Sequence, residues 1–239
     1  MSTKSDPPLP GWVAYQKPTE DDLRCANYSK REWRVALNGE KLVVTMDRSG
    51  TGQFHELRVN DGWLRGENFG EFGGGLYWTS ADRRRKKRLS NENIIGLVNS
   101  SKGVLAIAGL RHMDTDYGKV LQISDGPGPT RKAVELADLS WAPDAFASES
   151  PDSLIVLTTN GIARVTTASK VDQLLRTHYE LLWPNSMTRS SNGVIHIGMR
   201  HFITRLTPNG KTYDEEWFVP ADCAHFTYRD YDCVCSAKQ

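Results

Sequence analysis

The feature that most constrains this chain is a short phrase that occurs twice. Residues 103–113 read Gly-Val-Leu-Ala-Ile-Ala-Gly-Leu-Arg-His-Met, and residues 193–202 read Gly-Val-Ile-His-Ile-Gly-Met-Arg-His-Phe. With a gap of one residue the two copies agree almost throughout, and they begin about 90 residues apart. That interval is about twice the 40–50 residues of one four-stranded propeller blade. The repeat therefore predicts a chain built from stacked copies of one β unit.

Short apolar segments bounded by Gly, Asn, Asp and Pro run along most of the chain and predict strands. They are apolar on both faces, which a strand needs only where sheets cover it on both sides. The sequence therefore predicts an all-β fold, a β-propeller of five blades closed by the chain termini. One short helix or turn is expected over Ser169–Tyr179. The segments that we interpret as inner strands are Lys41–Met46, Gly75–Ser80, Gly103–Ala108, Ser153–Thr158 and Gly193–Gly198.

The segment Trp183-Pro184-Asn185-Ser186-Met187, followed by the second copy of the phrase, resembles the blade starts of small bacterial propellers. The resemblance is to propellers of the gluconolactonase and NHL-repeat kind. It implies a single propeller domain over residues 25–239, after a flexible leader over residues 1–24. In sugar-lactone hydrolases of this fold it also implies a metal held by a Glu, two Asn and an Asp, with Asn185 at a position where such a ligand could lie.

The overall charge and hydropathy exclude some partners. The chain has 239 residues and a formal net charge of +1, so no bulk field draws it to nucleic acid or to an anionic membrane. No apolar run approaches the roughly 20 residues that span a bilayer. No signal peptide is visible at the start, although removal of an export signal would leave the same pattern. We expect a monomer that binds no nucleic acid and does not span a membrane.

All the cysteines lie near the two ends of the chain: Cys25, Cys223, Cys233 and Cys235. This clustering predicts disulfides that tie the terminal segments together, with Cys25 bonded to one of the other three. The pairing stays open, and four buried thiols in a reduced protein are the alternative. Disulfides indicate an oxidising compartment. We therefore expect a periplasmic protein, with the cytoplasm as the alternative.

Both copies of the phrase contain an Arg-His dipeptide, Arg111-His112 and Arg200-His201. In a ring of like blades, equivalent positions share one height and radius. These four residues are therefore predicted to form a binding site on one face, where arginine forks hold an acidic group. The alternative is that they are hairpin residues kept by repeat ancestry.

Two charged segments give further candidate contacts. Residues 83–88 are all basic and predict a solvated loop, with Arg84 and Arg85 available to an acidic protein partner. Asp114 and Asp116 alternate as in a calcium loop, but the chain lacks the glutamate that an EF-hand has at its twelfth position. A charged hairpin loop is predicted there, and both aspartates remain candidate binding residues.

The sequence offers little support for chemistry. Cys223, His225, Cys233 and Cys235 are potential zinc ligands, but zinc sites usually space paired ligands by two to four residues. No nucleophile elbow, Walker loop or dinucleotide motif is present. We therefore predict no catalytic residue, no metal and no cofactor.

These observations favour a non-catalytic binding protein whose loop face occludes a partner. By analogy of fold, it is a bacterial immunity or inhibitor protein directed against a toxin or a hydrolase. The alternative is a metal-dependent, lactonase-like propeller hydrolase that uses the central channel. Its metal ligands would be Asn185 with Asp114 or Asp116.

Overall fold

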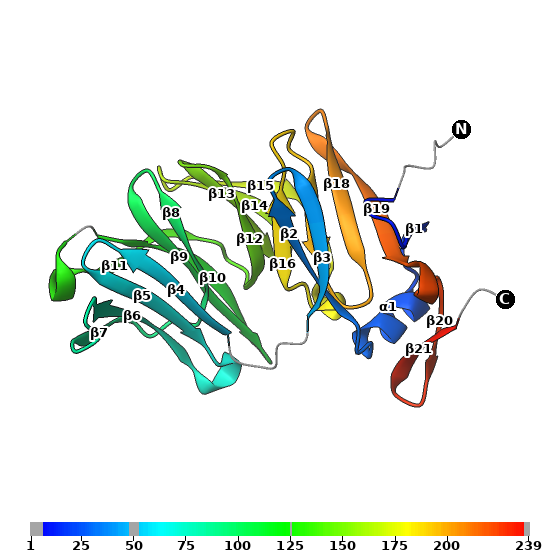
Figure 1. Cartoon of the computed structure of the whole chain (residues 1–239), viewed down its shortest axis with the longest axis horizontal. Coiled ribbons are helices and arrows are strands. Elements are labelled where there is room, and N and C mark those ends of the chain that lie inside the picture. Colours follow the sequence, from blue (N-terminus) through cyan, green and yellow to red (C-terminus); the bar gives the residue numbers. More distant parts are fainter. Residues whose placement is uncertain (1–6, 48–52, 125, 237–239) are drawn as a thin grey trace. The chain divides into compact units, whose positions relative to one another are not determined.

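The computed structural model describes residues 7–47, 53–124 and 126–236. The chain divides into two compact units: unit 1 takes its residues from 1–48 and 178–239, and unit 2 from 49–177. Both consist mainly of antiparallel strands (Figure 1). Each unit is described by itself below.

Unit 2 contains three antiparallel sheets within its described residues, each formed by strands that follow one another in the chain. This up-and-down order is the order of propeller blades. The first sheet is β4 (Gln53–Val59), β5 (Gly62–Asn68), β6 (Gly74–Ser80) and β7 (Lys86–Ser90); the second is β8 (Ile94–Ser100), β9 (Gly103–His112), β10 (Thr115–Ile123) and β11 (Ala133–Asp138); the third is β12 (Pro143–Ser150), β13 (Ser153–Thr158), β14 (Gly161–Thr166) and β15 (Val171–Leu175). Single 3-10 turns lie at η1 (Gly70–Phe72) and η2 (Gly128–Thr130).

Unit 1 contains a sheet that joins the two ends of the chain. Strand β1 pairs antiparallel with β19, so the blue N-terminal strand lies beside the orange C-terminal one in Figure 1. The sheet has the order β1 (Trp12–Tyr15), β19 (Thr212–Pro220), β18 (Ile203–Asn209), β17 (Ile195–Gly198) and β16 (Ser186–Arg189). Two hairpins accompany it, β2 (Glu32–Asn38) with β3 (Lys41–Asp47) and β20 (His225–Arg229) with β21 (Asp232–Ser236), and 3-10 turns lie at η3 (Glu180–Leu182) and η4 (Ala221–Cys223).

Unit 1 also holds α1 (Glu20–Asn27), the one α-helix of the described residues. The helix begins with a capping box: Asp22 N donates to Thr19 Oγ1, and Thr19 N donates to an Asp22 carboxylate oxygen. Such boxes satisfy backbone donors that the first helical turn leaves unpaired. The helix buries Cys25 and Ala26. The segment expected as a leader therefore contains β1 and most of this helix.

The prediction of an all-β propeller fold is confirmed. The five segments interpreted as inner strands correspond to β3, β6, β9, β13 and β17, although β17 begins only at Ile195. Strands β9, β13 and β17 each lie next to the strand at one end of their sheet. The helix expected over Ser169–Tyr179 is wrong, because Val171–Leu175 pairs with β14 instead. Five blades and a single domain over residues 25–239 remain predictions.

Strand β9 shows why inner strands of this chain are apolar on both faces. Its side chains alternate between two core clusters of unit 2. Val104, Ala106 and Ala108 pack with residues of β5 and β6, whereas Leu105 and Ile107 pack with residues of β13. Successive side chains of a strand point to opposite faces, so one strand contributes to two layers of core.

Candidate functional site

A strained tryptophan marks a polar cluster in unit 1. Trp183 follows η3 with φ 51° and ψ 62°, a left-handed conformation that is costly for a bulky side chain, and the residue is 56% exposed. Its Nε1 donates to Asn27 Oδ1 at 2.8 Å, and the Arg200 guanidinium lies 4.8 Å from the centre of its ring. Strained residues that surrounding contacts hold in place cluster at functional sites. Trp183 therefore directs attention to the side chains around it.

Arg200 connects this tryptophan to the first strand of the neighbouring hairpin. Its Nε donates to Glu32 Oε1 at 2.6 Å, and its Nη1 donates to the Asn27 carbonyl oxygen at 2.8 Å. Glu32 and Arg200 also form a backbone bridge. These contacts fix the carboxylate of Glu32 at the beginning of β2.

Asn185 lies in the same loop as Trp183, between η3 and β16, and directly precedes β16. Its backbone N donates to the Gly198 carbonyl oxygen at 3.0 Å. Its Oδ1 accepts from Ser186 Oγ at 2.8 Å, and that hydroxyl in turn accepts from Val35 N at 2.9 Å. The Nδ2 atom of Asn185 is buried without a hydrogen-bond partner among the described residues. One end of this amide is therefore unsatisfied inside unit 1, which costs about 1–3 kcal/mol unless a ligand pairs with it.

Unit 2 carries similar residues at the starts of two first strands. Asn93 lies directly before β8, and Asp144 is the second residue of β12. Asn93 Nδ2 donates to the Gly70 carbonyl oxygen at 3.0 Å, while its Oδ1 is buried without a partner among the described residues. Both units thus place oxygen-bearing side chains where a first strand begins.

Sequence reasoning identified Asn185 but missed Glu32, Asn93 and Asp144. A signal was present: each is a polar residue at the beginning of a first strand, as in Pro143-Asp144 and Pro184-Asn185. This signal was overlooked because the sequence comparison used the strongly apolar inner strands. The first strands of the sheets have weaker apolar patterns.

The structure gives the two Arg-His dipeptides different surroundings. His112 ends β9 with its side chain 38% exposed, and its Nε2 lies 2.7 Å from Glu71 Oε2. Arg111 is exposed. His201, in contrast, is fully buried with φ 68°, so its side chain is not on a surface where a partner would touch it. The binding roles of Arg111, His112 and Arg200 remain predictions.

The two predicted charged loops are partly structural. Asp116 accepts from Ala142 N at 2.6 Å and from Thr159 Oγ1 at 2.9 Å, which ties β10 to the third sheet of unit 2. Asp114 is exposed in the β9–β10 turn. As binding or metal-ligating residues, both aspartates remain untested.

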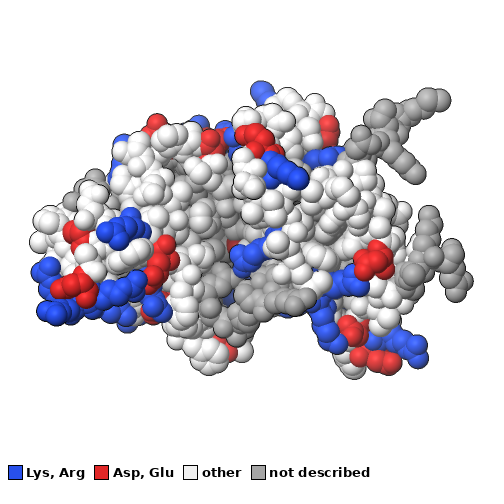
Figure 2. Space-filling view, viewed as in Figure 1, with Lys and Arg blue, Asp and Glu red and all other residues white. Residues whose placement is uncertain are grey.

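The basic run is partly a strand, since residues 86–88 begin β7. Figure 2 shows Lys and Arg side chains gathered over the part of unit 2 that contains β6 and β7, with acidic side chains among them. Lys86 Nζ lies 3.9 Å from the centre of the Tyr77 ring, and Arg83 pairs with Glu56 at 3.4 Å. Arg84 and Arg85 are exposed, and their contact with a partner stays a prediction.

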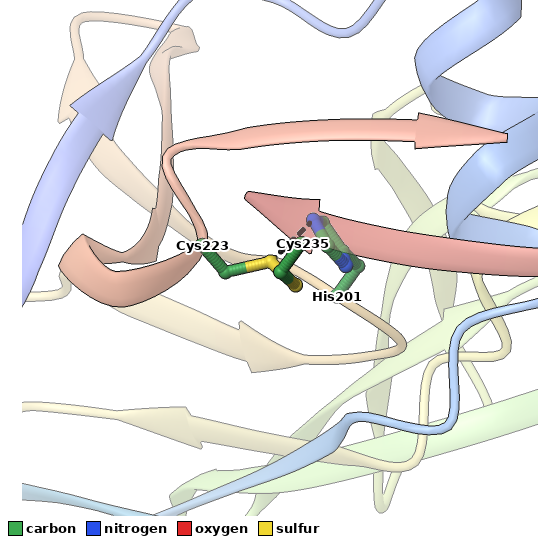
Figure 3. Close-up of side chains that lie close together, drawn as sticks. All are labelled: His201, Cys223 and Cys235. Atoms are coloured by element: carbon green, nitrogen blue, oxygen red, sulfur yellow. Dashed lines mark hydrogen bonds between the residues drawn. A yellow bond between two sulfur atoms is a disulfide. The ribbon is translucent and has the colours of Figure 1, made fainter. Parts of the chain in front are cut away.

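All four cysteines lie in unit 1 and form two disulfides, Cys25–Cys233 and Cys223–Cys235. The prediction of disulfides is confirmed, and Cys25 bonds to one of the C-terminal cysteines as expected. Figure 3 shows the His201 ring beside the Cys223–Cys235 bridge. Two disulfides are typical of proteins from oxidising compartments.

Two buried histidines of unit 1 stay neutral over most of the pH range. Burial, with a smaller contribution from Arg31, lowers the pKa of His201 to about 4. Burial, with the neighbouring Arg205, also lowers the pKa of His196 to about 4. A buried imidazole loses hydration when it gains a proton, so both rings resist protonation.

The sequence matches no protein-family model and no curated protein. Similar solved structures include a calcium-binding regucalcin from Agrobacterium tumefaciens, with 13% identity, a TM-score of 0.44 and coverage of 72% of this chain and 62% of that one. A luciferin-regenerating enzyme has 8% identity, a TM-score of 0.46 and coverage of 77% and 68%. A virginiamycin B lyase from Staphylococcus aureus has 14% identity, a TM-score of 0.36 and coverage of 77% and 74%. This chain thus spans less than two thirds of the regucalcin.

These structures are β-propellers of the gluconolactonase type, so the predicted resemblance is confirmed. The prediction of a non-catalytic immunity or inhibitor protein, and with it the prediction that the chain is not an enzyme, is contradicted by this comparison. The finding that overturns both is that two of these proteins are named as enzymes, a luciferin-regenerating enzyme and a lyase. Among the described residues, no helix has the length and hydropathy of a membrane span.

Proposed function

We propose that this chain is a metal-dependent hydrolase of the lactonase-like kind. The single observation that carries the proposal is that unit 1 presents two oxygen-bearing side chains, Glu32 and Asn185, where its first strands begin. Carboxylate and amide oxygens are the ligands that hard divalent cations prefer. The resemblance to sugar-lactone hydrolases implies the same residue types.

The residues of unit 1 fit a cation in part. The unsatisfied amide end of Asn185 supports a ligand there, because amide nitrogen and oxygen are interchanged by a simple flip of the side chain. Glu32 supplies a carboxylate from β2, the strand whose Val35 N donates to the Ser186 hydroxyl that also bonds to Asn185. The Arg200 guanidinium binds Glu32 Oε1 and repels a cation at that oxygen. A metal would therefore use the other carboxylate oxygen of Glu32 together with neutral oxygens.

The other residues of the cluster have separate roles in such a reaction. When bound, a divalent cation polarises a carbonyl oxygen of the substrate. Arg200 holds the Glu32 carboxylate in one orientation and supplies positive charge for the carboxylate that ester cleavage produces. Trp183 is 56% exposed, so an apolar part of the substrate can pack against the part of its ring that Arg200 leaves uncovered. In the hydrolysis, water oxygen bonds to the carbonyl carbon, the ring C–O bond breaks, and the ring oxygen takes a proton.

The experiment measures divalent-cation binding and lactone hydrolysis for the wild type, Glu32→Gln and Asn185→Ala. We expect one bound ion per chain, and a loss of about 100-fold or more in kcat/KM in both variants. Asn209→Ala is the matched control, since Asn209 is an exposed residue at the end of β18 that bonds to Asp214, and it should behave as the wild type. A wild type that binds no divalent ion and opens no lactone of a broad panel would overturn the proposal.

We further infer that the protein works in the periplasm of a bacterium. The two disulfides support an oxidising compartment. Thiol titration of protein isolated from its host under alkylating conditions tests this, because periplasmic protein would show no free thiol. Four alkylated cysteines per chain would favour the cytoplasm instead.

A further inference from the structure

We propose that His201, Cys223 and Cys235 form a zinc site once a dithiol reductant opens the Cys223–Cys235 bridge. This site is separate from the oxygen ligands of the proposed hydrolase and does not depend on them. In an oxidising compartment the same residues form the disulfide, and in a reducing one they would bind Zn²⁺.

The three ligand atoms already lie together. His201 Nε2 is 3.7 Å from Cys223 Sγ, and the nitrogen and the two sulfurs all lie within 4.8 Å of one another. His201 and Cys223 are fully buried, and Cys235 is partly exposed. Figure 3 shows the imidazole directed at the bridge. The sequence suggested His225 as the histidine of a zinc set, but His225 is exposed, and the structure supplies His201 instead.

Tetrahedral zinc requires little movement of these atoms. With Zn–S of about 2.3 Å and Zn–N of about 2.0 Å, ligand atoms lie roughly 3.5–3.8 Å apart. The separation of His201 Nε2 and Cys223 Sγ meets this value. The sulfurs of the bridge must move apart after reduction, which rotation about the Cα–Cβ bonds allows because Cys235 lies at the edge of the cluster. The fourth position then takes a water from that exposed side.

Ser29 orients the imidazole for this role. Ser29 Oγ lies 3.2 Å from His201 Nδ1 and also accepts from Arg31 N at 3.1 Å. In the tautomer with its hydrogen on Nδ1, the ring donates to the hydroxyl, and the lone pair of Nε2 points to the sulfurs. A ligating histidine commonly donates its other ring N–H to such a partner.

The redox and charge balance of the site is complete. The disulfide takes two electrons and two protons from the dithiol, which leaves as its own disulfide. Zn²⁺ then replaces the two thiol protons, and two thiolates with one neutral imidazole cancel its charge. A neutral complex is what a buried site can hold without a large desolvation cost.

Cobalt(II) is the probe, because thiolate ligation gives a charge-transfer band in the near ultraviolet. The full chain is reduced with a phosphine, freed of reductant without oxygen, and titrated with Co²⁺ and then Zn²⁺. We expect the band to saturate at one Co²⁺ per chain, to be bleached by Zn²⁺, and to be absent from the oxidised protein. A reduced wild type that keeps its near-UV circular dichroism and gives no band would overturn the proposal.

Variants separate the proposed ligands from their neighbours. His201→Asn should weaken Co²⁺ binding by at least tenfold, because it removes the imidazole ligand. Asn is chosen because it tolerates the left-handed backbone at this position, so the variant should still fold. His225→Asn is the matched control and should leave the titration unchanged. Ser29→Ala should weaken binding about 10- to 100-fold. Unchanged affinity in His201→Asn would overturn the assignment.

X-ray absorption of the reduced, zinc-loaded wild type provides a test that needs no variant. We expect two sulfur and two nitrogen or oxygen ligands, whereas three or four sulfurs would overturn the ligand set. The oxygen ligands of the proposed hydrolase give no thiolate band, and their metal binding is measured in the oxidised protein. The two proposals therefore fail independently.

Discussion

The two copies of the repeated phrase share two glycines, and the second of them, Gly109 in one copy and Gly198 in the other, serves the same purpose in both. A Cβ on Gly109 would lie 2.4 Å from Pro143 Cδ, and one on Gly198 would lie 2.3 Å from the Trp33 carbonyl oxygen. Pro143 begins β12 and Trp33 belongs to β2, so in each copy the glycine faces a first strand of another sheet of its own unit. Only glycine leaves room for that approach. The repeat has kept this residue for packing.

The Arg-His dipeptides that follow have diverged. Strand β9 continues through His112, and its turn contains only Met113 and Asp114. Strand β17 ends at Gly198, so Met199–Phe202 form a wider loop in which His201 is buried between the disulfides. A shared phrase therefore predicts shared architecture where the backbone packs, but it does not predict a shared binding site where the loops begin.

The largest effect is expected from removing the disulfides. Among the described residues, they lie beside the second copy of the phrase and not beside the first. The Cys25–Cys233 bridge joins residues 208 apart. Replacing both cysteines by serine should cost roughly 4–5 kcal/mol of unfolding free energy, because the bridge restricts a long loop of the unfolded chain. Denaturant unfolding measures the loss. Cys223→Ser with Cys235→Ser should cost less, about 3 kcal/mol, since that bridge spans 12 residues.

Hydrogen exchange of the Cys25/Cys233 variant shows where the loss acts. Backbone amides of Met199–Phe202 should exchange faster, and those of β9 should keep their protection at low denaturant. Equal acceleration in both copies would mean that the disulfide supports the whole chain rather than the second copy.

The shared glycines give the next effect and should behave alike. Gly109→Ala and Gly198→Ala should each lower the unfolding free energy by about 3 kcal/mol, because strands must move to admit the methyl group. Gly210→Ala is the control: its Cβ would meet nothing within 4 Å, and its φ of +61° costs only about 1 kcal/mol. Thermal unfolding compares the three. A mild effect at one repeat glycine would show that only one copy needs the close approach.

The buried histidine of the second copy should make stability depend on pH. The pKa of His201 is about 4 in the folded chain and near 6.5 when unfolded. Between these values the unfolded chain binds more protons, so the contribution is complete above pH 6.5 and is lost as the pH falls towards 4. The loss is up to roughly 3 kcal/mol for this ring, and His196 acts in the same direction.

Urea unfolding from pH 7 to pH 4 tests this through His201→Asn. Between pH 7 and pH 4 the variant should lose less unfolding free energy than the wild type. Comparing the two proteins cancels the contribution of the carboxylates that they share. Identical slopes would mean that His201 takes up a proton in the folded chain as readily as in the unfolded one.

The sequence predicted the strands well because turn residues and apolar runs agree in this chain. Strand β9, for example, is apolar on both faces because two core clusters lie against it. Val171–Leu175 was mistaken for a helix because its apolar spacing also fits a helical period. Pairing with β14 decides in favour of a strand, and that partner is invisible to a local pattern.

The candidate site was predictable only in part. Asn185 could be found because a blade-start motif surrounds it, whereas Glu32 could not. Its place depends on Arg200, which is 168 residues away in sequence and pairs with it only in the folded chain. The buried position of His201 likewise depends on Ser29 and the cysteines, whose distances no spacing rule provides.

The smallest effect on the unfolding free energy is expected at His112, the residue of the first copy that corresponds to His201 in the second. This residue pairs with Glu71 at 2.7 Å, but both side chains are more than a third exposed, and exposed ion pairs contribute little because water screens them. His112→Ala should therefore change the unfolding free energy by less than about 0.5 kcal/mol. A double-mutant cycle with Glu71→Ala measures the coupling free energy of the pair by denaturant unfolding. A coupling free energy well above about 1 kcal/mol would mean that the stability of the first copy depends on His112 as that of the second depends on His201. The two loops would then have diverged less than the different burial of their histidines indicates.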